Sequence, residues 1–278
     1  MGNNLKQLKN QLKELKLKHL AAQFDDFMIS ACNGEKPNTQ FLMDALEIEL
    51  SERRRLSMEK RLKYAKFPVF DKPFDLNGFD FGKRQGVSKR QILELSSNLI
   101  WIDKAYNVLF LGGSGLGKSF LACYLGYKAA EAGYNVICQN VETMSIGTYN
   151  VIFISMNDLA QLLKTENVLS RSKSRMKRIR NCDLLILDEV GSAVLDKQEA
   201  NKMFQLICDF YQQTSLILTS NKSFDAWTNT LGDAVITTAV LDRILHKCEV
   251  FNIDGDSWRI EDQQSILKNL LKAGENLD

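Results

Sequence analysis

The sequence predicts an α/β fold in which helices flank a parallel sheet, preceded by a small all-helical domain. Three observations support this prediction. From about Asn77 onward, apolar runs of strand length alternate with helical patterns, as in repeated β-α-β units. Residues 1 to about 66 contain no convincing strand. A glycine-rich turn at 112–117 lies between an apolar run and a helical pattern. We therefore expect a helical domain over 1–75 and an α/β domain over 76–278.

The composition is that of a globular protein. Hydrophobic residues make up 45% and charged residues 25% of the 278 positions, and no apolar run has the length of a membrane span. The N-terminus lacks the apolar core of a signal peptide. Six scattered cysteines without a C-x-x-C pair, and only two histidines, argue against a disulfide framework and a zinc site. We therefore expect reduced thiols, a cytoplasmic location and no membrane partner.

The N-terminal region has the pattern of helices with basic flanks. Four leucines repeat at helical spacing among lysines: Leu5, Leu8, Leu12 and Leu15. A second helix is expected over 39–66, and it ends in a basic stretch that begins at Arg53. Pro68 and Pro73 then mark a connector. The basic regions are equally consistent with binding of DNA or a protein partner and with a solvated helix face.

Five apolar runs are expected to form the strands of the sheet. They are Asn107–Leu111, Val151–Ser155, Asp183–Leu187, Ser215–Thr219 and Val250–Ile253. A local repeat complicates the second strand, because the tetrapeptide at 134–137 recurs at 149–152. The segment from Ile137 to Val151 therefore resembles an insertion, and a tolerated surface insertion is favoured over a functional loop. The sequence leaves open which copy enters the sheet.

The glycine-rich turn matches a phosphate-binding loop, the Walker A pattern G-x-x-x-x-G-K-[ST]. Its residues are Gly112, Gly113, Ser114, Gly115, Leu116, Gly117, Lys118 and Ser119. A strand before it and a helix expected over Phe120–Ala132 make backbone N–H groups converge on a β-phosphate. Lys118 is expected to reach the β- and γ-phosphates and Ser119 to ligate magnesium, so ATP and Mg²⁺ are the expected cofactors. Dinucleotide binding is excluded because no G-x-G-x-x-G is present.

A second motif follows the apolar run at 184–187. Asp188 and Glu189 end that predicted strand, and ligands of parallel α/β sheets lie at the carboxyl ends of strands. In this Walker B interpretation, Asp188 supports magnesium and Glu189 is the base that polarises the attacking water. The alternative is an ordinary acidic pair at a strand end. Asn221 ends the next strand and can orient water, or it can start a turn or cap the following helix.

A basic segment lies between the two motifs. Residues 171–180 carry six lysines or arginines and no acid. Such a density of positive charge next to a nucleotide site predicts contact with a phosphate backbone that does not depend on base sequence. The expected contacts are Lys173, Arg175, Lys177 and Arg178. The alternative is a solvated helix face.

Together these motifs resemble one known family. The resemblance rests on both Walker elements, on Thr219-Ser220-Asn221, on Leu241-Asp242-Arg243-Ile244-Leu245-His246, and on Gly255-Asp256-Ser257-Trp258-Arg259. Their order and spacing are similar to those of the IstB-like transposition helper ATPases, relatives of the DnaC helicase loader and the DnaA initiator. The resemblance implies an AAA+ ATPase core without the usual helical lid. It also implies ATP-dependent homo-oligomers on duplex DNA and partnership with a DDE transposase from the same insertion element.

The resemblance also implies roles for three residues. Asn221 corresponds to the sensor-one residue, and Arg243 to an arginine finger that reaches the γ-phosphate of a neighbouring subunit. Arg259 corresponds to the sensor-two arginine, which contacts nucleotide within its own subunit. Surface or salt-bridge arginines are the alternatives. Two departures stand out: Trp258 replaces the family's common tyrosine, and the insertion precedes the second strand.

The sequence thus favours an ATP-hydrolysing, DNA-binding regulator of transposition, located on the bacterial nucleoid. A helicase loader with the same ATPase core is a close competitor. A P-loop small-molecule kinase would bind a phosphoryl acceptor and need no arginine from a neighbour. A DNA-binding scaffold without enzymatic activity is the third alternative.

Overall fold

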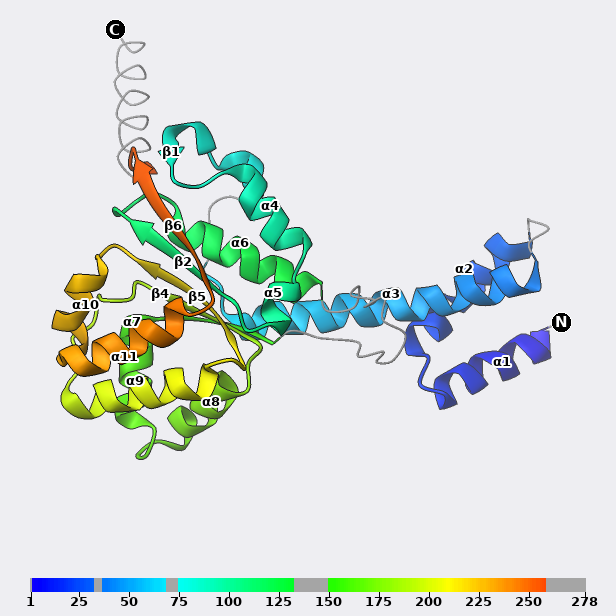
Figure 1. The fold of residues 1–278 in the computed structure, drawn as a ribbon. Helices are drawn as coiled ribbons and strands as arrows, with labels where there is room; N and C mark the ends of the chain where they lie inside the picture. The colour runs from blue at the N-terminus through cyan, green and yellow to red at the C-terminus, as the bar shows by residue number, and fades with distance from the viewer. Residues whose placement is uncertain (1, 33–36, 69–74, 133–149, 259–278) are drawn as a thin grey trace, which may run out of the picture. The chain divides into compact units, whose positions relative to one another are not determined.

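The computed structural model describes residues 2–32, 37–68, 75–132 and 150–258. The chain divides into two compact units, Met1–Lys60 and Arg61–Asp278. Both contain the kinds of element that the sequence predicts: helices in the first unit, and alternating strands and helices in the second (Figure 1). Among the described helices, none is both long and apolar enough to cross a bilayer.

The first unit is a small helical assembly. It contains α1 (Gly2–Glu14), α2 (Lys18–Cys32) and most of α3 (Asn38–Ala65). Its core is small, with Leu20, Phe24 and Ala45 buried. The buried Glu49 carboxylate of α3 accepts hydrogen bonds from the backbone N–H groups of His19 and Leu20, at 2.7 and 3.0 Å. A side chain of α3 therefore satisfies N–H groups in the first turn of α2 that have no partner within that helix.

The boundary between the units lies inside α3, earlier than the domain boundary expected at residue 75. The end of this helix belongs to the second unit because it packs there. Ala65 is fully buried, and Leu62 and Phe67 pack against the same core cluster. The Arg61 guanidinium also donates to the Ala130 carbonyl oxygen at 2.8 Å, near the end of α6 (Lys118–Glu131).

A six-stranded sheet organises the second unit. In chain order its strands are β1 (Arg84–Gln85), β2 (Asn107–Gly112), β3 (Val151–Ser155), β4 (Leu184–Asp188), β5 (Ser215–Ser220) and β6 (Cys248–Gly255). The spatial order is β1-β6-β2-β5-β4-β3, and every pairing is parallel except that of β1 with β6. The expected parallel sheet is therefore confirmed, with each expected strand present. Because β2, β5 and β4 are parallel neighbours, their carboxyl ends lie side by side.

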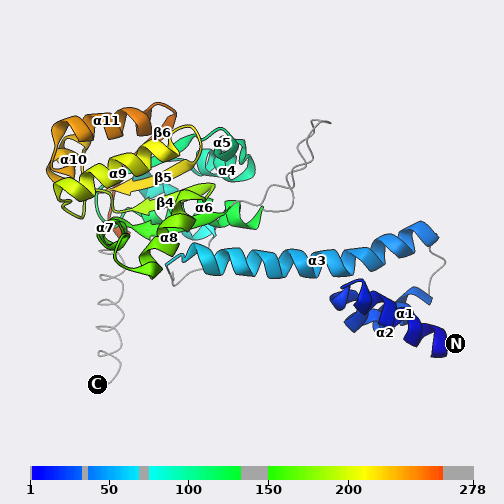
Figure 2. The same cartoon turned by 90° about the horizontal axis from the view of Figure 1, so that it is seen from below.

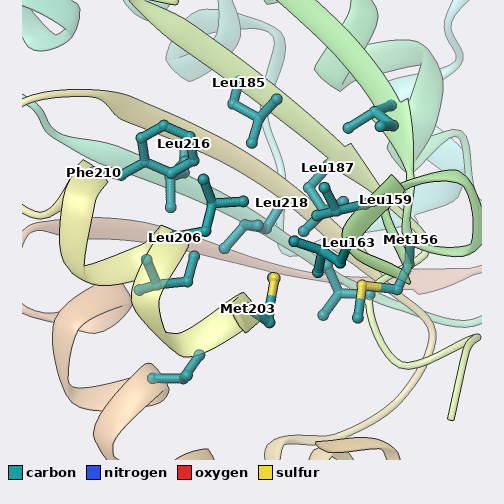
Figure 3. Close-up of a cluster of buried hydrophobic side chains, with 14 of the residues drawn as sticks. Met156, Leu159, Leu163, Leu185, Leu187, Met203, Leu206, Phe210, Leu216 and Leu218 are labelled. Carbon is teal, nitrogen blue, oxygen red and sulfur yellow. The ribbon is translucent and has the colours of Figure 1, made fainter. Parts of the chain in front are cut away.

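Helices cover both faces of this sheet (Figure 1). One face carries α4 (Lys89–Ser97), α5 (Ile100–Asp103) and α6. The other carries α7 (Met156–Thr165), α8 (Ser170–Arg180), α9 (Lys197–Phe210), α10 (Phe224–Leu231) and α11 (Ala234–Leu245). Alternate residues of each strand point to opposite faces, so Phe110 and Leu109 lie in different core clusters. Figure 3 shows the second cluster, in which Leu187 and Leu218 meet Met203 of α9.

The second copy of the local repeat enters the sheet. Val151 and Ile152 begin β3 and pair with Leu184 and Leu185 of β4. The first copy, at 134–137, lies outside the described residues, as does most of the proposed insertion. The sequence could not distinguish the copies because their four residues are identical.

Candidate nucleotide-binding site

The glycine-rich loop begins where β2 ends, and three of its glycines have left-handed backbone angles. The φ values of Gly112, Gly115 and Gly117 are 140°, 78° and 84°. A Cβ atom on Gly112 would lie 2.0 Å from the Ile253 carbonyl oxygen, and one on Gly115 would lie 2.1 Å from Ser257 Oγ. Glycine is therefore required for both backbone conformation and space.

Lys118 begins α6 and lies inside the curve of this loop. Its ammonium donates to the carbonyl oxygens of Gly112 and Gly113, at 2.9 and 2.5 Å. The Leu116 side chain is buried in the core cluster on the α6 side of the sheet, so the loop is attached to that core. The N-terminus of α6, capped by Gly117, therefore faces the same space as the lysine charge. Backbone N–H groups and a positive charge at a helix N-terminus are suited to bind phosphate.

The two Walker motifs meet through one hydrogen bond. Ser119 Oγ donates to Asp188 Oδ1 at 2.7 Å, although 69 positions separate the two residues in the chain. Thr219 Oγ1, from β5, donates to the same carboxylate oxygen at 2.5 Å. Hydroxyl and carboxylate oxygens are the hard ligands that Mg²⁺ prefers, and Mg²⁺ sites commonly combine one carboxylate with substrate phosphates. The residues present therefore fit a magnesium ion.

Glu189 follows directly and has an unusual backbone. Its φ is 57°, a left-handed value that is uncommon for a residue with a side chain. Its N–H donates to Thr219 Oγ1 at 2.9 Å, and its side chain is exposed at the carboxyl edge of the sheet. Thr219 thus contacts both acidic residues, a role that the sequence did not predict. Its only signal is its position at the end of a neighbouring strand.

Asn221 lies between the two motifs, directly after β5. β5 pairs with β2 on one side and β4 on the other, so its carboxyl end lies between those of the strands that lead into the two motifs. Asn221 is exposed, and Ser223 rather than Asn221 is the N-cap of α10. The turn is instead held by Ser220, whose buried hydroxyl accepts from the Lys222 N–H and the Trp227 indole. Asn221 therefore follows the central strand β5 and is not the N-cap of α10, and its role in orienting water stays a prediction.

Arg243 lies near the amino ends of the strands, whereas the phosphate loop follows the carboxyl end of β2. It lines a small cavity with Asn107, the first residue of β2, and Thr214, which precedes β5. Its guanidinium donates to the Ala239 carbonyl oxygen at 2.8 Å and lies 5.0 Å from the centre of the Phe204 ring. A strand as long as β2 spans roughly 17 Å. Arg243 is therefore not brought together with the phosphate loop of the same chain.

Arg259 lies outside the described residues, but the residues before it contact the loop. The Trp258 N–H donates to the Gly115 carbonyl oxygen at 2.8 Å. The sequence motif at 255–259 therefore does reach the phosphate loop, through Ser257 and Trp258. Its nucleotide-contacting arginine stays a prediction.

The basic segment forms α8, which has one buried and one exposed face. Ser172, Met176 and Ile179 are buried against neighbouring helices, whereas Lys173, Lys177 and Arg178 are exposed. Arg175 is half-buried. Figure 2 shows the end of α3 beside this helix, where Arg178 lies 5.4 Å from the centre of the Tyr64 ring.

Arg180 differs from the four basic residues predicted to contact DNA because it pairs with acidic side chains. It forms an ion pair with Glu166, and the hydrogen bond from this guanidinium holds the pKa of Glu166 below its ordinary value. The same arginine lies 3.8 Å from Asp209. Its charge is therefore partly neutralised within the protein. The four residues predicted to contact DNA have no such ion pair among the described residues.

The chain matches the family of IstB-like ATP binding proteins over residues 10–266. An IS21-like insertion sequence ATP-binding protein of Bacteroides fragilis is 33% identical, over 97% of this chain and 95% of that protein. The corresponding IS21 protein of Pseudomonas aeruginosa is 34% identical, over 91% of this chain and 88% of its own length. That of IS232 from Bacillus thuringiensis is 34% identical, over 95% and 98%.

Solved structures with similar folds include replication proteins. The DnaC helicase loader aligns with a TM-score of 0.44 and 19% identity, over 60% of this chain and 92% of that one. AMPPCP-bound DnaA from Aquifex aeolicus aligns with a TM-score of 0.47 and 18% identity, over 72% of this chain and 57% of that one.

Proposed function

Since the chain belongs to the family of IstB-like ATP binding proteins, we propose that it hydrolyses ATP and uses the cycle to regulate DNA transposition. The observation that carries this proposal is the contact between Ser119 and Asp188. It unites the phosphate loop and the acidic strand end in one site, with Glu189 and Asn221 at its rim. Binding of ATP requires the loop alone, whereas hydrolysis also requires the acidic pair.

Each residue at this edge has a distinct task in the proposed reaction. The loop N–H groups and Lys118 hold the phosphates, as in other P-loop proteins. Ser119 and Asp188 would hold magnesium, which neutralises charge on the phosphates when bound. Glu189 accepts a proton from the attacking water, and the Asn221 amide orients that water. Thr219 fixes the Asp188 carboxylate and the Glu189 backbone relative to each other.

We further propose that the active form is an oligomer. Arg243 lies at the amino ends of the strands, away from its own phosphate loop. An arginine that stabilises charge on the transferring phosphoryl group must approach it closely. Arg243 can meet that requirement only at the site of a neighbouring subunit. ATP binding then assembles the subunits, and hydrolysis releases or remodels the assembly.

Duplex DNA is the proposed ligand of the exposed face of α8. The face carries lysines and arginines without an acidic neighbour in the helix, which suits contact with backbone phosphates without sequence preference. We propose a DDE transposase of the same insertion element as the protein partner, and action on the bacterial nucleoid. A replicative helicase is the alternative partner, because a helicase loader would use the same ATPase site.

Measuring ATP turnover with and without duplex DNA tests this proposal. Wild-type protein should release phosphate faster with DNA, and Lys118→Ala should not hydrolyse ATP in either condition. Turnover only with a small phosphoryl acceptor would instead support a kinase, and the absence of turnover would support a scaffold. Binding assays with the cognate transposase and with the replicative helicase distinguish the two regulators.

A further inference from the structure

Arg84 is a buried arginine close to the phosphate loop that the proposed mechanism does not use. Only 3% of its surface is exposed, although it belongs to the short edge strand β1. Burying a guanidinium is costly unless carbonyl oxygens or aromatic faces replace its water. The contacts of Arg84 should therefore show what compensates for burying its guanidinium.

Those contacts join two separate segments of the second unit. The guanidinium donates to the Asp80 carbonyl oxygen and to the Asp256 carbonyl oxygen, each at 3.2 Å. It also lies 5.7 Å from the centre of the Phe79 ring and 5.2 Å from that of Trp258, within the range of cation–π attraction. Each segment thus offers Arg84 one ring and one carbonyl group.

The first segment touches the phosphate loop at Gly117. A Cβ atom on Gly117 would lie 2.5 Å from Phe79 Cε2, so the Phe79 ring packs directly on this turn of the loop. Phe79 also stacks on Phe120, in the first turn of α6, with ring centres 6.0 Å apart. A shift of Phe79 would therefore disturb the loop where it enters its helix.

The second segment touches the loop at Gly115. The Trp258 N–H donates to the Gly115 carbonyl oxygen at 2.8 Å, and Ser257 fills the space beside the Gly115 Cα atom. This hydrogen bond orients the peptide group that follows Gly115. The loop is thus held at Gly115 and at Gly117 by two segments that meet at Arg84.

We propose that Arg84 is a positioning residue for ATP binding: it clamps the segments of Phe79 and Trp258 against the phosphate loop. The clamp holds Gly115 and Gly117 in the backbone conformation that directs their N–H groups toward phosphate. This inference rests on the nucleotide site of the proposed function.

Equilibrium binding of a fluorescent ATP analogue with Mg²⁺ tests the clamp. The variants are Arg84→Met, which keeps much of the aliphatic stem, and Arg84→Lys, which keeps the charge but loses the planar fork. The control is Arg90→Met, since Arg90 is an exposed arginine of α4. Thermal unfolding of each variant without nucleotide sets a binding temperature at which all of them are folded.

We expect Arg84→Met to bind the analogue about tenfold more weakly, because hydrogen bonds from a charged group hold both segments. Arg84→Lys should fall between it and wild type, and Arg90→Met should match wild type. Wild-type affinity in folded Arg84→Met would overturn the clamp and assign Arg84 to stability alone. If the wild-type protein itself fails to bind the analogue, or binds it no better than Lys118→Ala, the proposed function fails instead.

A second variant covers the case in which Arg84→Met does not fold. Trp258→Ala removes the ring from Arg84 but leaves the backbone N–H that binds Gly115. We expect this variant to bind the analogue more weakly than Trp258→Phe, which keeps an aromatic face. Equal affinity in Trp258→Ala and wild type would overturn the clamp.

Discussion

Thr219 joins the two acidic residues of the candidate site with a single hydroxyl. It donates to Asp188 Oδ1 and accepts from the Glu189 N–H. A left-handed backbone at a residue such as Glu189 costs about 1–3 kcal/mol, and such strain is often found at functional sites. The hydrogen bond from Glu189 to Thr219 offsets part of that cost. The sequence predicts both carboxylates but not this role of Thr219, because the role depends on the long-range pairing of β4 with β5.

Substituting Glu189 separates ATP binding from hydrolysis. Glu189→Gln keeps the size of the side chain and removes its ability to accept a proton from water. We expect this variant to bind ATP with wild-type affinity, to hydrolyse it at least about 100-fold more slowly, and to remain assembled. Phosphate release and sedimentation in the presence of ATP measure these properties.

The control for this variant is Glu94→Gln, an exposed glutamate on α4. It should hydrolyse ATP at the wild-type rate. If Glu189→Gln also hydrolyses ATP at that rate, Glu189 is not the base.

At the scale of elements, the exposed face of α8 is the clearest candidate for binding DNA. Reversing Lys173, Arg175 and Lys177 to glutamate should weaken binding to all duplex sequences alike, because these residues would contact backbone phosphates. Wild-type binding should weaken with salt, with a log–log slope near −0.9 for each neutralised phosphate, and the variant should have a shallower slope. Fluorescence anisotropy over a salt series with two unrelated duplexes measures both effects.

A control with the same change in charge is available on the opposite face of the sheet. Reversing Lys89, Arg90 and Lys104, all exposed, alters the net charge equally without touching α8. This control should bind DNA more tightly than the α8 variant. Equal loss in both variants would mean that net charge, and not α8, governs binding, and loss on one duplex only would indicate base recognition.

The carboxylate of Glu49 stabilises the first unit in a pH-dependent way. Burial raises the pKa of Glu49, but the N–H groups of Leu20 and His19 and the Arg53 guanidinium outweigh this effect, so the pKa lies below its ordinary 4.5. A lowered pKa in the folded state contributes stability that is present above pH 4.5 and is lost as the pH falls through the lowered value.

Glu49→Gln should therefore destabilise α2 by about 1–3 kcal/mol at neutral pH, because the amide has no charge and its single oxygen cannot accept from both the two N–H groups and the Arg53 guanidinium. Hydrogen exchange of the His19 and Leu20 amides measures this effect in the full chain. The difference between wild type and variant should shrink below pH 4.5. Glu59→Gln, an exposed position of α3, should not change this exchange. Equal protection of these amides in wild type and Glu49→Gln would contradict the role of Glu49.

The elements differ in how well the sequence predicts them. The buried strands are found because apolar runs between polar turns are typical of parallel sheets, and the observed β3 even has the expected bounds. β1 is missed because two residues carry no periodicity, and its pairing with β6 depends on contacts across the fold. Arg84 and Phe79 are missed for the same reason: their contacts with Trp258 and Gly117 join distant parts of the chain.

At the scale of the whole molecule, the phosphate loop and Arg243, which the proposed oligomer would bring together between neighbours, lie at opposite ends of the strands in one chain. The phosphate loop and Asp188 lie at the carboxyl ends of the strands. Arg243 lines a cavity at their amino ends, next to Asn107. If the loop and Arg243 are both needed for hydrolysis, an isolated subunit is incomplete, and ATP turnover depends on assembly.

Mixing two inactive variants tests this dependence. Arg243→Ala should bind ATP but hydrolyse it poorly, since an arginine in this role contributes roughly 10³–10⁵ in rate. Lys118→Ala should fail to bind ATP productively, because it lacks the charge on the β- and γ-phosphates. Each variant alone should be nearly inactive. In a mixed oligomer, the intact loop of an Arg243→Ala subunit meets the intact Arg243 of a Lys118→Ala neighbour, so part of the activity should return.

If Arg243 acts between subunits, the recovered ATP turnover should increase with the number of interfaces that join an Arg243→Ala subunit to a Lys118→Ala subunit. Titrating Lys118→Ala into Arg243→Ala should raise turnover to a maximum near equal amounts and lower it again at excess. Adding a Lys118→Ala, Arg243→Ala double variant should give no recovery, because that subunit supplies neither an intact loop nor Arg243. Co-assembly is verified by pulling down one tagged variant with the other. Demonstrated co-assembly without recovery would mean that Arg243 acts within its own subunit or only in folding, and it would favour a kinase-like monomer over the oligomeric ATPase.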